Sequence, residues 1–195
     1  MIFFPNNIVV IIHFYRGRYG NNCITYPFGA SMNLSDRKSR KSVSANPLRI
    51  IIDDRSHRVS RRRLCRLAFS LYGMERINPL KQTILVFCSN TTIRRLNAGY
   101  RKIDRPTDVL SFTFSEPDLL GEIYISLPRA AQQAKEYGVS LDNEINRLFV
   151  HGFFHLLGYD HKHLTDRLKM EKKELKYLRQ NVFFTGFSIT PANPK

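Results

Sequence analysis

Residues 151–161 read HGFFHLLGYDH and place three histidines in the spacing H-x3-H-x5-H. Residues four apart share one face of a helix, so His151 and His155 would lie one turn apart. Gly158 predicts the helix end, because glycine accepts the left-handed conformation that follows a C-cap. The chain would then fold back and bring His161 beside the other two histidines. Three imidazoles that leave one tetrahedral position open are typical of a catalytic zinc site.

Details of this stretch leave several alternatives open. His163 is a second candidate for the third ligand, although His161 fits the tight turn after Gly158 better. Asp160 would either orient an imidazole as a hydrogen-bond acceptor or belong to an exposed turn. Nickel and copper also accept nitrogen ligands, so the ligand type favours zinc without fixing the metal. Gly152 occupies the place of the glutamate base in H-E-x-x-H zinc peptidases, which argues against a peptidase.

Two further blocks of the sequence agree with the histidine stretch in order and spacing. They are LNAGYR at 96–101 with DRPTDVLSF at 104–112, and LGEIYIS at 120–126. Together with the histidine motif, these blocks resemble the YbeY family, that of the endoribonuclease YbeY or rRNA maturation factor. The resemblance covers about residues 47–180, and the histidine motif is its most specific part.

The resemblance implies a single-strand-specific, metal-dependent endoribonuclease with one Zn²⁺ ion bound by His151, His155 and His161. It also places Arg101 near the metal, where a guanidinium would contact a phosphate and balance the charge that develops on it. The alternative is a surface arginine that pairs with Asp104. The implied partners are an rRNA precursor, the small ribosomal subunit and ribosome-assembly proteins, and the implied processes are maturation of the small-subunit rRNA 3′ end and ribosome quality control.

The composition agrees with one globular domain and a polyanionic partner. The chain has 195 residues with 43% hydrophobic content, enough for a single core. Its formal net charge is +15, and residues 1–66 hold 13 Lys and Arg against 3 Asp and Glu. Nucleic acid or a ribosome surface would compensate this charge, although a merely solvated helix face is the alternative. The densest group of arginines is Arg58, Arg61, Arg62, Arg63 and Arg66.

The remaining features concern location and domain organisation. Three cysteines without paired spacing indicate a reducing compartment, and no run is long enough to span a bilayer, so a cytoplasmic protein is expected. Residues 1–46 show no clear period and lie outside the resemblance. We expect a poorly ordered basic extension at 1–46, which could be a mobile arm, a targeting peptide or an overextended gene start. The catalytic domain would span 47–180, and 181–195 would form a C-terminal tail.

Hydrophobic periodicity predicts an α+β fold with a single mixed four-stranded sheet and about five helices. Asp108, at the start of the third strand, would close a turn, as carboxylates at such positions often do. The last two strands are close enough for an antiparallel hairpin. The expected strands cover 48–53, 83–88, 107–114 and 122–126. The expected helices cover 60–74, about 91–98 with Thr91 or Thr92 as the cap, 126–138 with Ser126 as the cap, 140–158 beginning at Ser140, and 165–180.

Two functions of other classes stay open from the sequence alone. The first is a metal-dependent hydrolase of another bond, such as a peptide or amide, against which Gly152 and the positive charge argue. The second is a non-catalytic ribosome-assembly factor with a structural zinc. In that case His151→Ala would lower thermal stability and ribosome binding together, without a separate loss of cleavage.

Overall fold

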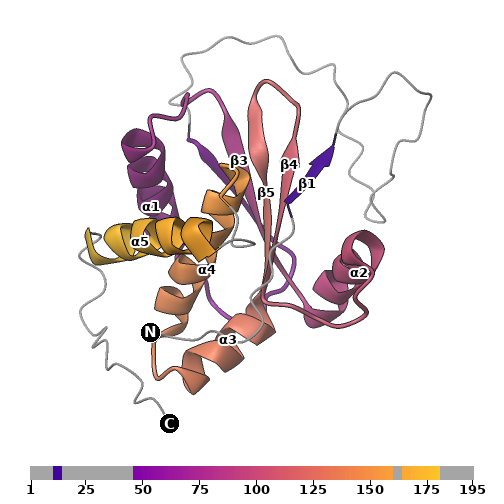
Figure 1. The fold of residues 1–195 in the computed structure, drawn as a ribbon. Coiled ribbons are helices and arrows are strands. Elements are labelled where there is room, and N and C mark those ends of the chain that lie inside the picture. Colours follow the sequence, from indigo (N-terminus) through magenta and orange to yellow (C-terminus); the bar gives the residue numbers. More distant parts are fainter. Residues whose placement is uncertain (1–10, 15–45, 160–163, 181–195) are drawn as a thin grey trace, which may run out of the picture.

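The computed structural model describes residues 11–14, 46–159 and 164–180, which form one mixed sheet with helices on both faces (Figure 1). Across the sheet the strands follow the order β1-β4-β5-β3-β2. The pair β4–β5 is antiparallel, and the other three neighbouring pairs are parallel. In chain order the strands are β1 (Ile11–Phe14), β2 (Leu48–Ile52), β3 (Gln82–Cys88), β4 (Val109–Phe114) and β5 (Leu119–Ser126).

All four strands expected from the sequence form and lie in this one sheet, which confirms the α+β fold. The number of strands is one higher than expected, because β1 adds a parallel edge strand beside β4, from the pair Ile11–Ser111 to the pair Phe14–Phe114. The β-branched run at 8–12 is a strand signal, but no strand was predicted there because the surrounding residues have no period. Residues 1–10 and 15–45 of the predicted extension and the tail from residue 181 lie outside the described residues.

Five helices complete the described part of the fold. α1 and α4 pack on one face of the sheet and α2 packs on the other, while α5 lies across α4 (Figure 1). In chain order they are α1 (Arg61–Met74), α2 (Asn90–Arg101), α3 (Leu127–Glu136), α4 (Leu141–Leu156) and α5 (Leu164–Gln180).

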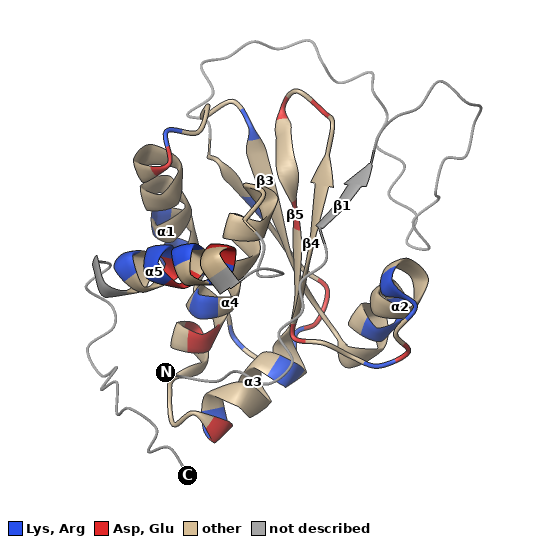
Figure 2. Ribbon diagram, in the orientation of Figure 1, with Lys and Arg blue, Asp and Glu red and all other residues tan. Residues whose placement is uncertain are grey.

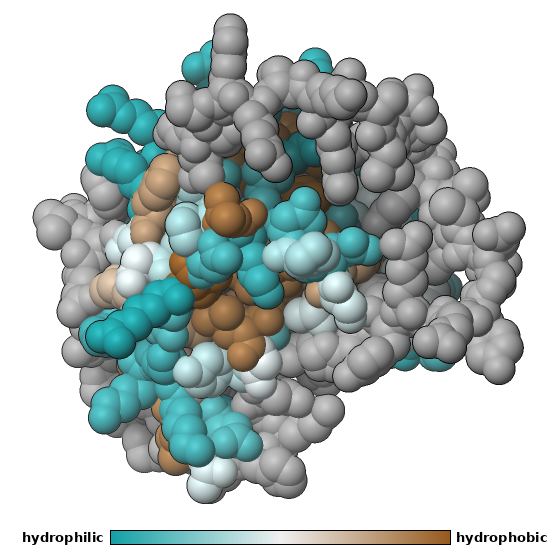
Figure 3. Space-filling model, turned by 90° about the horizontal axis from the view of Figure 1, so that it is seen from above, coloured by the Kyte–Doolittle hydropathy of each residue, from teal (hydrophilic) through white to brown (hydrophobic). Residues whose placement is uncertain are grey.

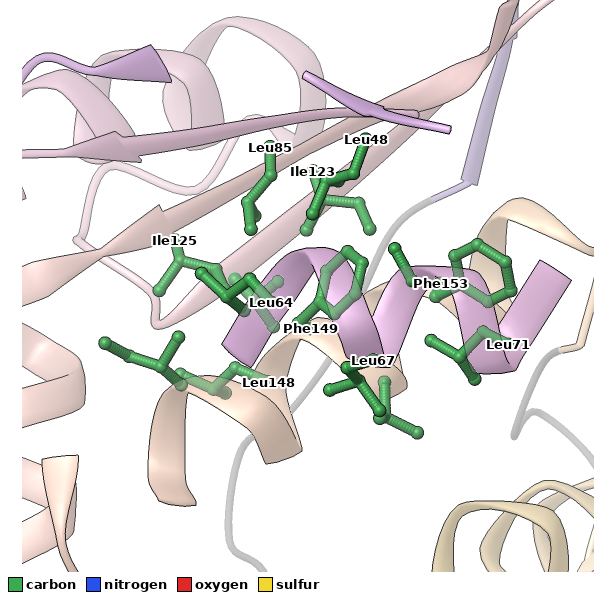
Figure 4. Close-up of a cluster of buried hydrophobic side chains, with 14 of the residues drawn as sticks. Leu48, Leu64, Leu67, Leu71, Leu85, Ile123, Ile125, Leu148, Phe149 and Phe153 are labelled. Carbon is green, nitrogen blue, oxygen red and sulfur yellow. The ribbon is translucent and has the colours of Figure 1, made fainter. Parts of the chain in front are cut away.

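The main hydrophobic core lies between the sheet, α1 and α4. Leu85, Ile123 and Ile125 point from the strands toward Leu64 and Phe149 of the helices (Figure 4). Every residue of α4 from 144 to 156 is buried, which is typical of a helix at the centre of a domain. Side chains in the second half of α4 are therefore held on all sides, and this rigidity matters for the histidines it carries.

Local capping explains where most helices begin. Ser126 and Ser140 cap α3 and α4 as predicted, each accepting a hydrogen bond from the backbone N–H three residues on. α2 differs from the expectation, because its cap is Ser89 rather than a threonine and the helix runs to Arg101 rather than Ala98. The threonines lie inside its first turn, where Ser89 already provides the hydrogen-bond acceptor.

The surface of the described part mixes hydrophilic and hydrophobic residues. Seen from above, hydrophobic residues lie at the centre of the molecule among hydrophilic ones (Figure 3). No helix in the described ranges combines the length and the apolar character that a membrane span requires. The large hydrophobic residues that are exposed come from several elements, namely Ile51, Phe69, Met74, Leu80, Tyr137, Leu168 and Leu175.

Candidate metal centre

Two of the three predicted ligands lie together in the second half of α4. His151 and His155 occupy consecutive turns, and their ring centroids are 4.8 Å apart with the planes inclined by 75°. His155 is fully buried and His151 is 7% exposed. Polar rings are costly to bury unless hydrogen bonds or a metal ion compensate them. The pair therefore offers nitrogen ligands from one rigid, buried helix.

Gly152, between the two histidines in sequence, faces the sheet. A Cβ atom at this position would stand 2.9 Å from Cγ2 of Ile123 and 2.9 Å from Oγ of Ser111, closer than real Cβ atoms approach. The Ser111 hydroxyl also donates a hydrogen bond of 3.1 Å to the carbonyl of Gly152. A glutamate has no room here, so close packing of α4 on the sheet excludes the base of the H-E-x-x-H pattern.

The end of α4 is the one predicted at Gly158. This glycine has φ of 86°, and its N–H donates to the carbonyl of His155 at 3.0 Å. The N–H of Tyr159 donates to the carbonyl of Phe154 at 3.1 Å, and the two rings pack edge to face with centroids 5.4 Å apart. These two hydrogen bonds and the ring contact form a Schellman motif, and α4 ends at Leu156, one residue after His155.

The third predicted ligand, His161, lies outside the described residues. The same is true of its rival His163 and of Asp160, the proposed orienting carboxylate. Among the residues that the structure describes, no group of three His, Cys, Asp or Glu side chains is placed to hold a metal ion. The described part of the site thus contains two of the three predicted ligands, and the metal-binding role of all three stays a prediction from the sequence.

The carboxylate of Glu174, on α5, contacts the imidazole of His151. Its Oε1 lies 2.7 Å from Nδ1 of the imidazole. A neutral imidazole with its proton on Nδ1 keeps the lone pair on Nε2, the form that binds a metal, so this donor set fits zinc. Sequence reasoning missed Glu174 because α5 is rich in charge. The available signal was its place between Met170 and Tyr177, two buried residues at helical spacing on the inner face of α5.

Arg101 is the last residue of α2, the helix that packs on the opposite face of the sheet from α4 (Figure 1). Its Nε atom is buried and has no hydrogen-bond partner among the described residues. Burial and the nearby charge of Arg105 lower the pKa of the guanidinium, whereas the charge of Asp108 raises it. The expected alternative partner, Asp104, instead forms two hydrogen bonds of 2.7 Å with Arg94. That Arg101 meets the same substrate as the histidines stays a prediction.

Asp108 has the structural position that the sequence favoured. Its Oδ1 accepts a hydrogen bond of 2.9 Å from the N–H of Val109, and its Oδ2 accepts one of 3.1 Å from Nε2 of Gln133. The buried carboxylate thus ties the start of β4 to α3.

Comparison with known proteins agrees with this architecture. A model of the family described as endoribonuclease YbeY matches residues 53–181. The endoribonuclease YbeY of Heliobacterium modesticaldum is 48% identical over 118 residues, which cover 52% of this chain and 71% of that protein. Its counterpart in Bacillus thuringiensis is 41% identical over 118 residues, covering 54% of this chain and 76% of that protein.

A solved structure shares the fold as well. The solution structure of TM1509 from Thermotoga maritima superposes with a TM-score of 0.50 at 29% sequence identity, covering 68% of this chain and 87% of that one. Since the family model spans more than half of the sequence, including the histidine helix, this chain belongs to the endoribonuclease YbeY family.

Proposed function

We propose that this protein is a zinc-dependent endoribonuclease that cleaves single-stranded RNA during the processing of ribosomal RNA. The observation that carries the proposal is the buried pair of His151 and His155 on α4, with Glu174 on Nδ1 of His151. The relatives at 41–48% identity are named endoribonuclease YbeY, which supports RNA as the substrate class.

The residues of the site have separate roles in this proposal. His151, His155 and His161 would hold the zinc ion. When bound, zinc supplies a Lewis acid that lowers the pKa of water and polarises phosphoryl oxygens. Arg101 would contact an oxygen of the scissile phosphate and balance the negative charge that grows on it in the transition state. Its buried Nε donor, which no described residue satisfies, suits an anionic substrate.

The charge of the molecule supports an RNA partner. The net charge is +15, and Lys and Arg residues lie on α1 and α5, on the same side of the sheet (Figure 2). Single-stranded RNA is held largely through its phosphates, so a basic surface raises both the affinity and the rate of association. We place the activity in the cytoplasm, on an rRNA precursor of the small subunit, together with ribosomal and assembly proteins.

The first test measures metal content and cleavage on one preparation. The full chain without a histidine tag is analysed by mass spectrometry for bound metal and incubated with a labelled single-stranded rRNA 3′ precursor. His155→Ala removes a fully buried ligand, and His57→Ala serves as the matched control because His57 is exposed. The expected result is about one zinc per chain, with cleavage lost in His155→Ala and unchanged in His57→Ala, while circular dichroism shows both variants folded.

The other outcomes contradict the proposal in different ways. A zinc-containing protein that fails to cleave RNA, even with small subunits added, would be a non-catalytic assembly factor. Cleavage at full rate by folded, metal-free His155→Ala would remove the metal from the mechanism. A wild-type protein that binds no divalent metal would overturn the assignment of the site.

A further inference from the structure

α4 and α5 contact each other at His151, one of the proposed metal ligands. Glu174 lies 23 residues from His151 in sequence, yet its Oε1 is 2.7 Å from Nδ1, with side-chain exposures of 19% and 9%. An ionised carboxylate only accepts hydrogen bonds, so the imidazole nitrogen that meets it must carry the proton. The contact thereby selects one tautomer of His151 and fixes the plane of its ring.

Neighbouring residues fasten α5 on both sides of this contact. Lys173 donates hydrogen bonds of 2.8 Å to both carboxylate oxygens of Glu75, the residue that caps the end of α1. Tyr177 donates to the same carboxylate. Glu75 thus accepts three hydrogen bonds from α5, and charge-assisted bonds of this kind are the strong ones.

Aromatic packing adds to this attachment. The ring centroids of Tyr177 and Phe154 are 5.4 Å apart. Phe154 stands between His151 and His155 in the sequence of α4. The ammonium of Lys173 stands 5.1 Å from the centre of the Tyr159 ring and 5.7 Å from that of Phe154. α5 is therefore held to the end of α1 and to the end of α4, and Glu174 projects from a fixed stretch of helix.

We propose that Glu174 is the positioning residue of the metal centre, so that the docking of α5 and the binding of metal are coupled. The inference rests on the proposed zinc site. Through the hydrogen bond to Nδ1, Glu174 makes Nε2 of His151 the metal-binding nitrogen and raises its basicity. Glu174 is part of α5, so interactions that hold α5 against α4 and α1 also stabilise the tautomer of His151 that binds metal through Nε2. By thermodynamic linkage, bound metal must in turn favour docked α5.

The experiment compares Glu174→Ala, Glu174→Gln and the control Glu171→Gln on the same helix. Zinc affinity of the full chain is measured by competition with a chromogenic chelator. We expect Glu174→Ala to weaken zinc binding by about 10–100-fold, the usual loss when an outer-sphere partner is removed. Glu174→Gln should fall between the alanine variant and wild type, because its carbonyl still accepts the hydrogen bond without the charge. Glu171→Gln should stay within about twofold of wild type.

Two further readouts separate positioning from a general structural effect. In metal-free protein, ¹⁵N NMR of His151 should show the Nδ1–H tautomer in wild type and a mixture of tautomers in Glu174→Ala. Hydrogen exchange of α5 amides should slow when zinc is added to wild type and respond less in Glu174→Ala. If Glu174→Ala does not fold, the same comparisons are made with Glu174→Gln.

The outcomes for this inference and for the proposed function differ. Folded Glu174 variants that bind zinc as tightly as wild type, with an unchanged His151 tautomer, would overturn the positioning role while leaving the zinc site intact. A wild-type protein without zinc affinity would overturn the proposed function itself, and the coupling with it.

Discussion

The guanidinium of Arg101 combines a buried donor with a position at the end of a helix. Its Nε atom is buried without a hydrogen-bond partner in the described part of the chain, and Asp104, its partner in the alternative interpretation, is bound to Arg94. Buried donors are normally satisfied, and the exceptions are often functional. A phosphate oxygen would satisfy this donor in the enzyme–substrate complex.

Arg101→Ala should therefore lower kcat for RNA cleavage by about 10²–10³-fold, the usual cost of removing one donor that stabilises transition-state charge. Zinc content and melting temperature should not change, because Arg101 lies on a different helix from the histidines. Arg94→Ala is the matched control, since it removes an exposed ion pair of small energetic value. Single-turnover cleavage assays give the comparison. Full activity in a folded, zinc-loaded Arg101→Ala would show that Arg101 has no role in the reaction.

At the scale of the element, close approach of α4 to the sheet sets the position of the histidines. Gly152→Ala would bring its Cβ against Ile123, whose β-branched side chain cannot rotate freely away. We expect a loss of about 1–3 kcal/mol in the free energy of unfolding, as for other overpacked core positions. Zinc affinity should fall as well, because a shift of α4 moves both ligands. Urea denaturation and chelator competition measure the two effects.

Gly73 provides the opposite case within α1. A Cβ atom there meets nothing within 4 Å, so Gly73→Ala should leave stability unchanged or raise it by up to about 1 kcal/mol, the helix-propensity gain. Equal stabilities for the two alanine variants would show that α4 tolerates displacement from the sheet, and the packing argument for the missing glutamate would fail.

The elements also show which features the sequence could predict. Caps and helix ends depend on residues within one turn, so Ser126, Ser140 and Gly158 could be assigned from the sequence and lie where expected. The contact of Glu174 with His151 and the pairing of β1 with β4 depend on tertiary structure. Glu174 did not stand out because charge on α5 is common, and the β-branched run at 8–12 did not show which strand it would pair with.

The whole molecule carries its positive charge unevenly. Residues 1–66 contain 13 Lys and Arg but 3 Asp and Glu, and no acidic residue lies in the first turn of α1. Arg58, Arg61, Arg62 and Arg66, which we name the α1 arginine cluster, are all exposed. Cations at a helix N-terminus oppose the helix dipole, so this arrangement costs stability. A polyanion bound over the cluster would neutralise these cations and remove the destabilisation. This argument favours contact of the cluster with RNA over a helix face that is only solvated.

Removal of two members of the α1 arginine cluster should therefore weaken RNA binding without affecting the chemical step. In Arg58→Gln/Arg62→Gln, we expect KM to rise while kcat is unchanged. The slope of log Kd against log salt concentration should fall by about 1.4, because each contact to a single-strand phosphate contributes about 0.7. Arg95→Gln/Lys135→Gln removes the same charge from exposed positions on α2 and α3 and serves as the control. Equal salt slopes for the two double variants would mean that RNA responds to net charge alone, whereas a loss confined to the first would locate the RNA path along the start of α1.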